Sequence, residues 1–206
     1  MKSIDSQSQS TGRGLNRRAI LRSTSLLGLA GLGLAGAGSQ SAHASDFAVD
    51  FYQAVNYTPG RTFTSGIPTS VTGIVIHWWG EPGWQDHTGV VNYLAGPNDS
   101  VVSAHYVVSG NGVSQLVELG DTAYHAGVYN INAQSIGIEC RPEMDEGTVA
   151  EVRELIQNLH AYFGPLWLEP HRAFTATGCP GTYMDLIPEF KVLAAGSHNL
   201  PPTPAV

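Results

Sequence analysis

Hydrophobic positions along the chain predict short strands that alternate with helices. The run "VTGIVIHWW", which starts at Val71, is apolar and rich in β-branched residues, and it predicts a buried strand that ends near His77. The runs "VSAHYVVS" and "VSQLVEL" flank a Gly-Asn-Gly turn at 110–112 and predict a β-hairpin. The run "QSIGIEC" predicts a further short strand.

Three segments have apolar residues at helical spacing. "DHTGVVNYLAG" is a short helix with Val90, Val91 and Leu94 on one face, and a longer helix extends to Phe163, before the Gly-Pro pair at 164–165. A capping box of Thr148 and Glu151 is expected to begin that longer helix. A last helical piece is expected near "TYMDLIPEFKVLA". Strands and helices interleave without a strict βαβ rhythm, so we expect a single α/β domain with a mixed central β-sheet flanked by helices.

The first 44 residues have the three parts of a secretory signal peptide. Arginines at 13, 17, 18 and 22 precede an apolar Leu/Gly/Ala run at 26–37, and the small-x-small site "AHA" at 42–44 follows. The run is shorter than the about 20 apolar residues that span a bilayer, so we expect cleavage after Ala44 rather than an uncleaved anchor. The pair Arg17-Arg18 resembles a twin-arginine signal, with an ordinary export signal as the alternative.

Removal of the signal changes the charge of the chain. Five of the ten basic residues and one of the seventeen acidic residues lie before Ser45, so the remaining 162 residues carry five basic and sixteen acidic side chains, a formal charge of −11. A mature chain this acidic has no basic surface that would bind nucleic acid or anionic lipid. We expect neither as a partner, and no stable membrane span after cleavage.

The stretch "PHRAFTATGCPG" at 170–181 places His171 and Cys179 eight positions apart in a loop-forming segment. On the residues alone, Cys179 is open to three interpretations: half of a disulfide with Cys140, a small apolar residue, or a metal ligand. Catalytic zinc takes three His, Cys or carboxylate ligands and keeps one position for water. His77, at the end of a predicted strand, is a third donor, with an ordinary buried histidine as the alternative.

Four segments carry a family resemblance. "TGIVIHWWG", "SAHYVVSGNGVSQLVE", "AYHAGVYNINAQSIGIE" and "HRAFTATGCPG" resemble, in order and spacing, the zinc N-acetylmuramoyl-L-alanine amidases that share a fold with peptidoglycan recognition proteins. The resemblance extends from about Val71 to Leu193. It implies a zinc amidase domain at 71–195, after a signal peptide at 1–44 and a lead-in at 45–70. The Pro-rich tail at 196–206 is expected to be disordered.

The resemblance implies that one Zn²⁺ per chain is bound by His77, His171 and Cys179. The disulfide alternative is less favoured, because successive strand residues point to opposite faces. If Glu139 faces the site, Cys140 faces away from it and from Cys179.

The resemblance also suggests how the chain catalyses hydrolysis. One branch of the family has a tyrosine at the position of Ala104, which this chain lacks, and another uses a glutamate at the position of Glu139, which this chain has. We expect Glu139 to be the general base and acid, with an exposed structural glutamate as the alternative. A family lysine that stabilises the oxyanion is replaced here by Thr177, the second expected catalytic residue.

The expected substrate is peptidoglycan, cleaved between N-acetylmuramic acid and L-alanine by a secreted enzyme of the cell envelope. His125 resembles a substrate-contacting histidine of the family, and a turn-capping histidine is its alternative. The other expected substrate-binding residues are Trp78, Trp79 and Tyr106, and Trp84 is a further aromatic that could stack on substrate. A non-catalytic module that binds muropeptides, or a zinc hydrolase acting on another amide, are the other functions considered.

Overall fold

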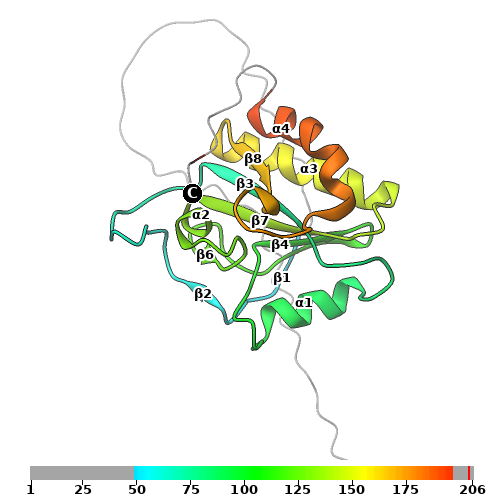
Figure 1. Ribbon diagram of the computed structural model, residues 1–206, viewed down its shortest axis with the longest axis horizontal. Coiled ribbons are helices and arrows are strands. Elements are labelled where there is room, and N and C mark those ends of the chain that lie inside the picture. The colour runs from blue at the N-terminus through cyan, green and yellow to red at the C-terminus, as the bar shows by residue number, and fades with distance from the viewer. Residues whose placement is uncertain (1–48, 197–203, 205–206) are drawn as a thin grey trace, which may run out of the picture.

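A six-stranded mixed β-sheet forms the centre of the molecule (Figure 1). The computed structural model describes residues 49–196 and 204, and its sheet has the strand order β1-β5-β4-β7-β3-β8. The strands are β1 (Val49–Phe51), β3 (Gly73–Trp78), β4 (Tyr106–Ser109), β5 (Gly112–Gln115), β7 (Ser135–Cys140) and β8 (Trp167–Pro170), and β2 (Tyr57–Thr58) pairs separately with β6 (Thr122–Ala123). Within the large sheet, only β4 and β5 are antiparallel neighbours, as the hairpin signal predicts. The expected α/β fold with a mixed sheet is confirmed.

Helices cover both faces of this sheet. They are α1 (His87–Ala95), α2 (Tyr129–Gln134), α3 (Glu146–Phe163) and α4 (Ile187–Ala195), with 3₁₀ turns η1 (His171–Ala173) and η2 (Gly181–Leu186). Figure 1 shows α3 and α4 on one side of the sheet and α1 on the other. The helix face predicted for α1 is confirmed, because Val90, Val91 and Leu94 are its buried residues.

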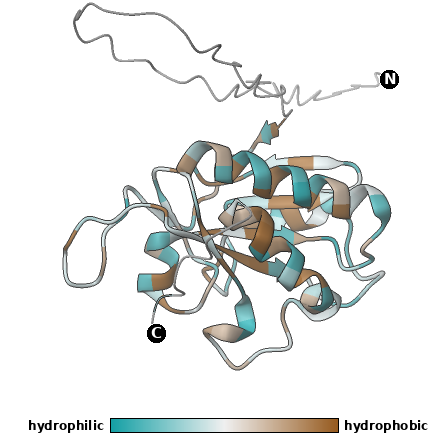
Figure 2. Cartoon of the chain, turned by 90° about the horizontal axis from the view of Figure 1, so that it is seen from above, coloured by the Kyte–Doolittle hydropathy of each residue, from teal (hydrophilic) through white to brown (hydrophobic). Residues whose placement is uncertain are grey.

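Strand alternation divides the buried side chains between two faces. The isoleucines of β3 and β7 form the main core with α3 and α4, and they include Ile76 and Ile138. Smaller clusters occupy the other face, one under α1 around Val107 and one around Val75 and Trp167. In Figure 2 the helices are banded, with hydrophobic segments alternating with hydrophilic ones, as expected for helices with one buried face. His77, two residues after Val75 on β3, lies on the face opposite α3 and α4.

The long helix α3 begins three residues earlier than the predicted capping box. Its N-cap is Asp145, whose side chain accepts hydrogen bonds from the Thr148 backbone N–H at 2.9 Å and from the Thr148 hydroxyl at 2.7 Å. Thr148 therefore lies inside the first turn, and the capping box of Thr148 and Glu151 is wrong. The helix ends at Phe163 before Gly164, as predicted.

The packed unit begins before Val71. Within the segment expected as a lead-in, β1 pairs with β5 at the edge of the main sheet, and Arg61 is buried with hydrogen bonds to three carbonyls between Asn132 and Ser135. The expected signal peptide lies outside the described residues, as does nearly all of the Pro-rich tail. Among the residues described, no helix has the length and apolar character needed to cross a bilayer.

Candidate metal centre

The three expected metal ligands come together at the carboxyl ends of two parallel strands. His77 lies near the end of β3 and is 2 % exposed, whereas His171 follows β8 directly, in η1. Cys179 is 9 % exposed, and its Sγ lies 3.7 Å from His77 Nδ1. The ligand atoms of the three residues all lie within 4.8 Å of one another. Parallel pairing of β3 with β8 brings His77 and His171 together, although they are far apart in sequence.

A tight loop returns Cys179 to this point after η1. The backbone N–H and the Nε–H of Arg172 both donate to the Cys179 carbonyl at 3.2 Å, and Arg172 also donates to the Gly178 carbonyl. Thr177 is exposed in this loop, and its hydroxyl oxygen accepts the Cys179 N–H at 3.2 Å. Hydrogen bonds within the loop thus hold the thiol over β3.

The three side chains suit a zinc ion. Burial lowers the pKa of His77 and of His171, so both imidazoles are neutral and can donate a lone pair. His171 Nε2 is buried and has no hydrogen-bond partner among the described residues, a costly arrangement unless a ligand such as a metal occupies it. Burial, and then the nearby Glu139 carboxylate, raise the pKa of Cys179 to about 12, so binding of a metal would release its proton.

Glu139 lies beside this group. On β7 it is the register partner of His77, so the two side chains are on the same face of the sheet. One of its carboxylate oxygens, Oε2, is inaccessible and has no hydrogen-bond partner among the residues described. Burial raises the pKa of Glu139 to about 7. A carboxyl with this environment can exchange a proton near neutral pH.

Cys140 follows Glu139 on β7 and points the other way, into the main core. Both cysteines are free thiols, so the disulfide alternative for Cys179 is wrong. The alternation of side chains along a strand accounts for this separation, as predicted.

His125 lies behind His77. It is 8 % exposed, and its Nδ1 lies 3.1 Å from His77 Nε2. Its Nε2 lies 3.3 Å from the hydroxyl oxygen of Ser135. Both ring nitrogens therefore have partners within the protein, which disagrees with the expected contact to substrate.

The expected aromatic residues differ in exposure: Tyr106 is buried, and Trp78 and Trp79 are partly buried. Tyr106 is 2 % exposed in the main core, so it offers almost no surface for the expected contact with substrate. Strand β4 begins only at Tyr106, whose register partner is Ile138, and this places the ring on the face opposite His77. Trp78 packs against the same core, and Trp79 packs against the cluster under α1. Trp84, by contrast, is 78 % exposed.

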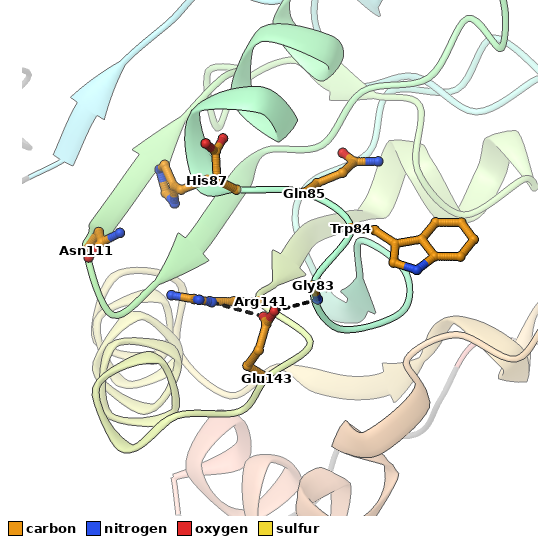
Figure 3. Close-up of a pocket in the computed structure, with 8 residues that line it drawn as sticks. Gly83, Trp84, Gln85, His87, Asn111, Arg141 and Glu143 are labelled. Atoms are coloured by element: carbon orange, nitrogen blue, oxygen red, sulfur yellow. Dashed lines mark hydrogen bonds and ion pairs between the residues drawn. The ribbon is translucent and has the colours of Figure 1, made fainter.

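A polar hollow of about 320 Å³ lies at the same edge of the sheet (Figure 3). Its lining residues are Gly83, Trp84, Gln85, Asp86, His87, Asn111, Arg141 and Glu143. The Glu143 carboxylate accepts the Gly83 N–H at 2.8 Å and the Arg141 Nε–H at 2.9 Å, which joins the loop after β3 to the loop after β7. In Figure 3 the indole of Trp84 points away from the other lining side chains. Among these residues only Trp84 is a candidate from the sequence, because the lining comes from three segments that are distant along the chain.

Several solved structures have a similar fold. The catalytic domain of XlyA has a TM-score of 0.57 and 26% sequence identity, over 71% of this chain and 98% of that chain. A mutant endolysin from Bacillus subtilis (TM-score 0.56, 24% identity, 71% of this chain and 97% of that chain) shares the fold. PlyL also shares it (TM-score 0.57, 15% identity, 73% of this chain and 98% of that chain). No curated protein sequence matches this chain.

One protein-family model matches the part of the chain that contains the proposed metal centre. It describes N-acetylmuramoyl-L-alanine amidases and matches residues 67–182, more than half of the chain. The matched region begins before His77 and ends after Cys179, so it contains all three converging ligands and Glu139. The chain therefore belongs to the N-acetylmuramoyl-L-alanine amidase family.

Proposed function

We propose that the chain is a zinc-dependent amidase that hydrolyses the bond between the lactyl group of N-acetylmuramic acid and L-alanine in peptidoglycan. The observation that carries the proposal is the convergence of His77, His171 and Cys179, whose ligand atoms lie within 4.8 Å of one another. Membership of the family supports the reaction class. The acidic carboxyl of Glu139 beside the ligands supplies the group that amide hydrolysis needs for proton transfer.

His77, His171 and Cys179 would hold the ion, and zinc in such a site supplies a Lewis acid for a carbonyl and makes water more acidic. Glu139 moves the proton in this mechanism. A carboxylate oxygen of Glu139 takes a proton from the attacking water and delivers it to the nitrogen of the departing L-alanine. Because burial raises the pKa of Glu139 to about 7, its acid and base forms are both populated near neutral pH.

Thr177 is the proposed donor to the carbonyl oxygen of the scissile amide. Its hydroxyl oxygen accepts the Cys179 N–H, which leaves its own proton for a further partner. A neutral hydroxyl stabilises developing negative charge less than a lysine would, because charge-assisted hydrogen bonds are about twice as strong as neutral ones. We therefore assign Thr177 an auxiliary role.

The polar hollow is the proposed binding surface for the part of the substrate next to the scissile bond. Arg141 follows Glu139 by two residues, and Gly83 follows His77 by six, so the hollow and the proposed centre share the carboxyl edge of β3 and β7. The exposed indole of Trp84 offers an apolar face, and the amides and charges of the lining residues offer hydrogen bonds. This combination suits a sugar or peptide substrate.

Export of the enzyme to the cell envelope is part of the proposal. It depends on the signal features of residues 1–44, including the Arg17-Arg18 pair of a twin-arginine signal. The domain limits proposed from the sequence, 71–195 for the amidase domain, are extended to include β1 and β2, since these strands pair with the rest of the fold.

Incubation of residues 45–206 with purified cell-wall sacculi tests the function. The proposal predicts new L-alanine amino termini, which a zinc chelator abolishes and added zinc restores. Binding to sacculi without new amino termini would instead indicate a non-catalytic muropeptide-binding module. Release of amino termini other than L-alanine would indicate that another amide is the substrate.

A further inference from the structure

Three hydrogen-bonded groups lie behind the proposed zinc ligand His77. His77 Nε2 contacts His125 Nδ1 at 3.1 Å, His125 Nε2 contacts the Ser135 hydroxyl at 3.3 Å, and that hydroxyl contacts the Ile131 carbonyl at 2.6 Å. All of these side-chain atoms belong to buried residues. We propose that the hydrogen bonds between Ser135 and His125 and between His125 and His77 position the His77 ring. They fix which of its two nitrogens faces the metal.

The Ile131 carbonyl, at the end of this series of hydrogen bonds, determines the direction of each of them. A carbonyl oxygen can only accept, so the single hydroxyl proton of Ser135 is donated to Ile131. The hydroxyl oxygen must then accept from His125 Nε2, which therefore carries the ring proton. A neutral imidazole has one N–H, so His125 Nδ1 has a lone pair and accepts from His77 Nε2–H.

This assignment leaves the lone pair of His77 on Nδ1. That nitrogen is the one 3.7 Å from Cys179 Sγ, on the side of the other proposed ligands. The imidazole is thus held in the tautomer that can bind a metal through Nδ1. Ligating histidines commonly donate their other N–H to a fixed acceptor, and loss of that acceptor typically weakens metal binding about 10–100-fold.

His125 is itself held on two further sides. The Asn132 side chain accepts the backbone N–H of His125 at 3.1 Å and that of Ala126 at 2.7 Å. The ring lies directly over Gly137, where a Cβ atom would come within 2.4 Å of His125 Cγ. Gly137 lies two residues before Glu139 on β7. The same strand therefore contains both the residue that packs against the His125 ring and the proposed proton-transfer residue.

The inference rests on the proposed function in one respect, that His77 holds zinc. Its test measures zinc affinity by competition with a chromophoric chelator, and the tautomer of His77 by two-bond ¹H–¹⁵N NMR of the zinc-loaded protein. For the wild type we expect a protonated Nε2 on His77 and a metal-bound Nδ1. H125F should weaken zinc binding about 10–100-fold, whereas H125N, which can return an acceptor near the Nδ1 position, should recover most of the affinity.

Two controls separate positioning from folding. S135A keeps the His125 ring but removes its acceptor, so it should weaken zinc binding by a smaller factor and lose the single tautomer of His125. H160Q changes a histidine that bonds the Ala194 carbonyl on the other face of the sheet, and it should leave zinc affinity unchanged. If H125F does not fold, S135A and the wild-type tautomer decide the question.

The inference is overturned if folded H125F and S135A bind zinc as tightly as the wild type, or if His77 binds the metal through Nε2. Failure of the proposed function gives a different result. If the wild type binds no zinc the centre itself is wrong. If it binds zinc with the expected tautomer but does not cleave peptidoglycan, the positioning holds and the proposed reaction fails.

Discussion

Glu139 and His77 are register partners on the parallel strands β7 and β3, and their side chains project from the same face of the sheet. This pairing places a carboxyl whose pKa burial raises to about 7 next to the most deeply buried proposed ligand. The neighbouring positions on the two strands, Ile76 and Ile138, point into the main core. Two adjacent strands therefore supply core side chains on one face and two residues of the proposed site, His77 and Glu139, on the other.

Replacement of Glu139 by glutamine separates binding from turnover. E139Q keeps the size of the side chain but can no longer exchange a proton, so we expect kcat to fall about 10²–10⁴-fold. Zinc content should stay the same, because Glu139 is not one of the proposed ligands. Assay on sacculi together with metal analysis checks both. A fully active E139Q enzyme would mean that another residue is the base.

The two cysteines form a matched pair for testing the thiol ligand. Substitution C179S should lower zinc affinity by at least tenfold, since serine is a poor ligand for zinc at neutral pH. Substitution C140S changes a buried thiol on the opposite face and should leave zinc affinity unchanged, although it places a hydroxyl in the core and lowers stability. Chelator competition on both variants provides the measurement. Equal affinities would contradict the assignment of Cys179.

The N-cap of α3 gives a stability prediction that does not involve the site. Substitution D145A should lower the free energy of unfolding by about 1 kcal/mol at pH 7, measured by urea denaturation. Partial burial alone would raise the pKa of Asp145, but hydrogen bonds from Thr148 lower it below its ordinary value. Its contribution is thus fully present above the ordinary pKa of an aspartate and is lost as pH falls through the lower folded value. The difference between variant and wild type should shrink below about pH 4.

Trp84 tests the proposed role of the polar hollow. Because its side chain is 78 % exposed, W84A should change stability by less than about 0.5 kcal/mol. Loss of an aromatic contact with substrate should raise KM about 2–10-fold, with kcat nearly unchanged. W78A provides the contrast, since Trp78 packs against the main core and its loss should lower the melting temperature. An unchanged KM for W84A would remove Trp84 from the substrate surface.

The sequence predicted the elements with long or clear hydrophobic patterns. The strand ending near His77, the hairpin at 110–112, β7 and the three predicted helical segments all occur. It did not predict β1, β6 or β8, which have two to four residues each. Patterns this short cannot be distinguished from loops, and these strands form because a neighbouring strand offers unpaired backbone groups.

Errors at individual residues arose from competing local signals and from long-range packing. Asp145 and Thr148 are both good N-cap residues three positions apart, and the structure uses the first because its carboxylate reaches the Thr148 N–H. Tyr106 was expected to contact substrate, but it is the first residue of β4 and its ring lies on the face opposite His77. His125 was assigned from resemblance alone, and its bond to His77 depends on the packing of distant segments that no local pattern contains.

The central claim is that His77, His171 and Cys179 bind one zinc ion. Metal analysis of residues 45–206 purified without chelator, in parallel with H77A, tests it most directly. We expect one zinc per chain in the wild type and a loss of about nine-tenths or more of it in H77A at the same free zinc concentration. A metal-free wild type that takes up no added zinc, or full zinc occupancy in folded H77A, would contradict it.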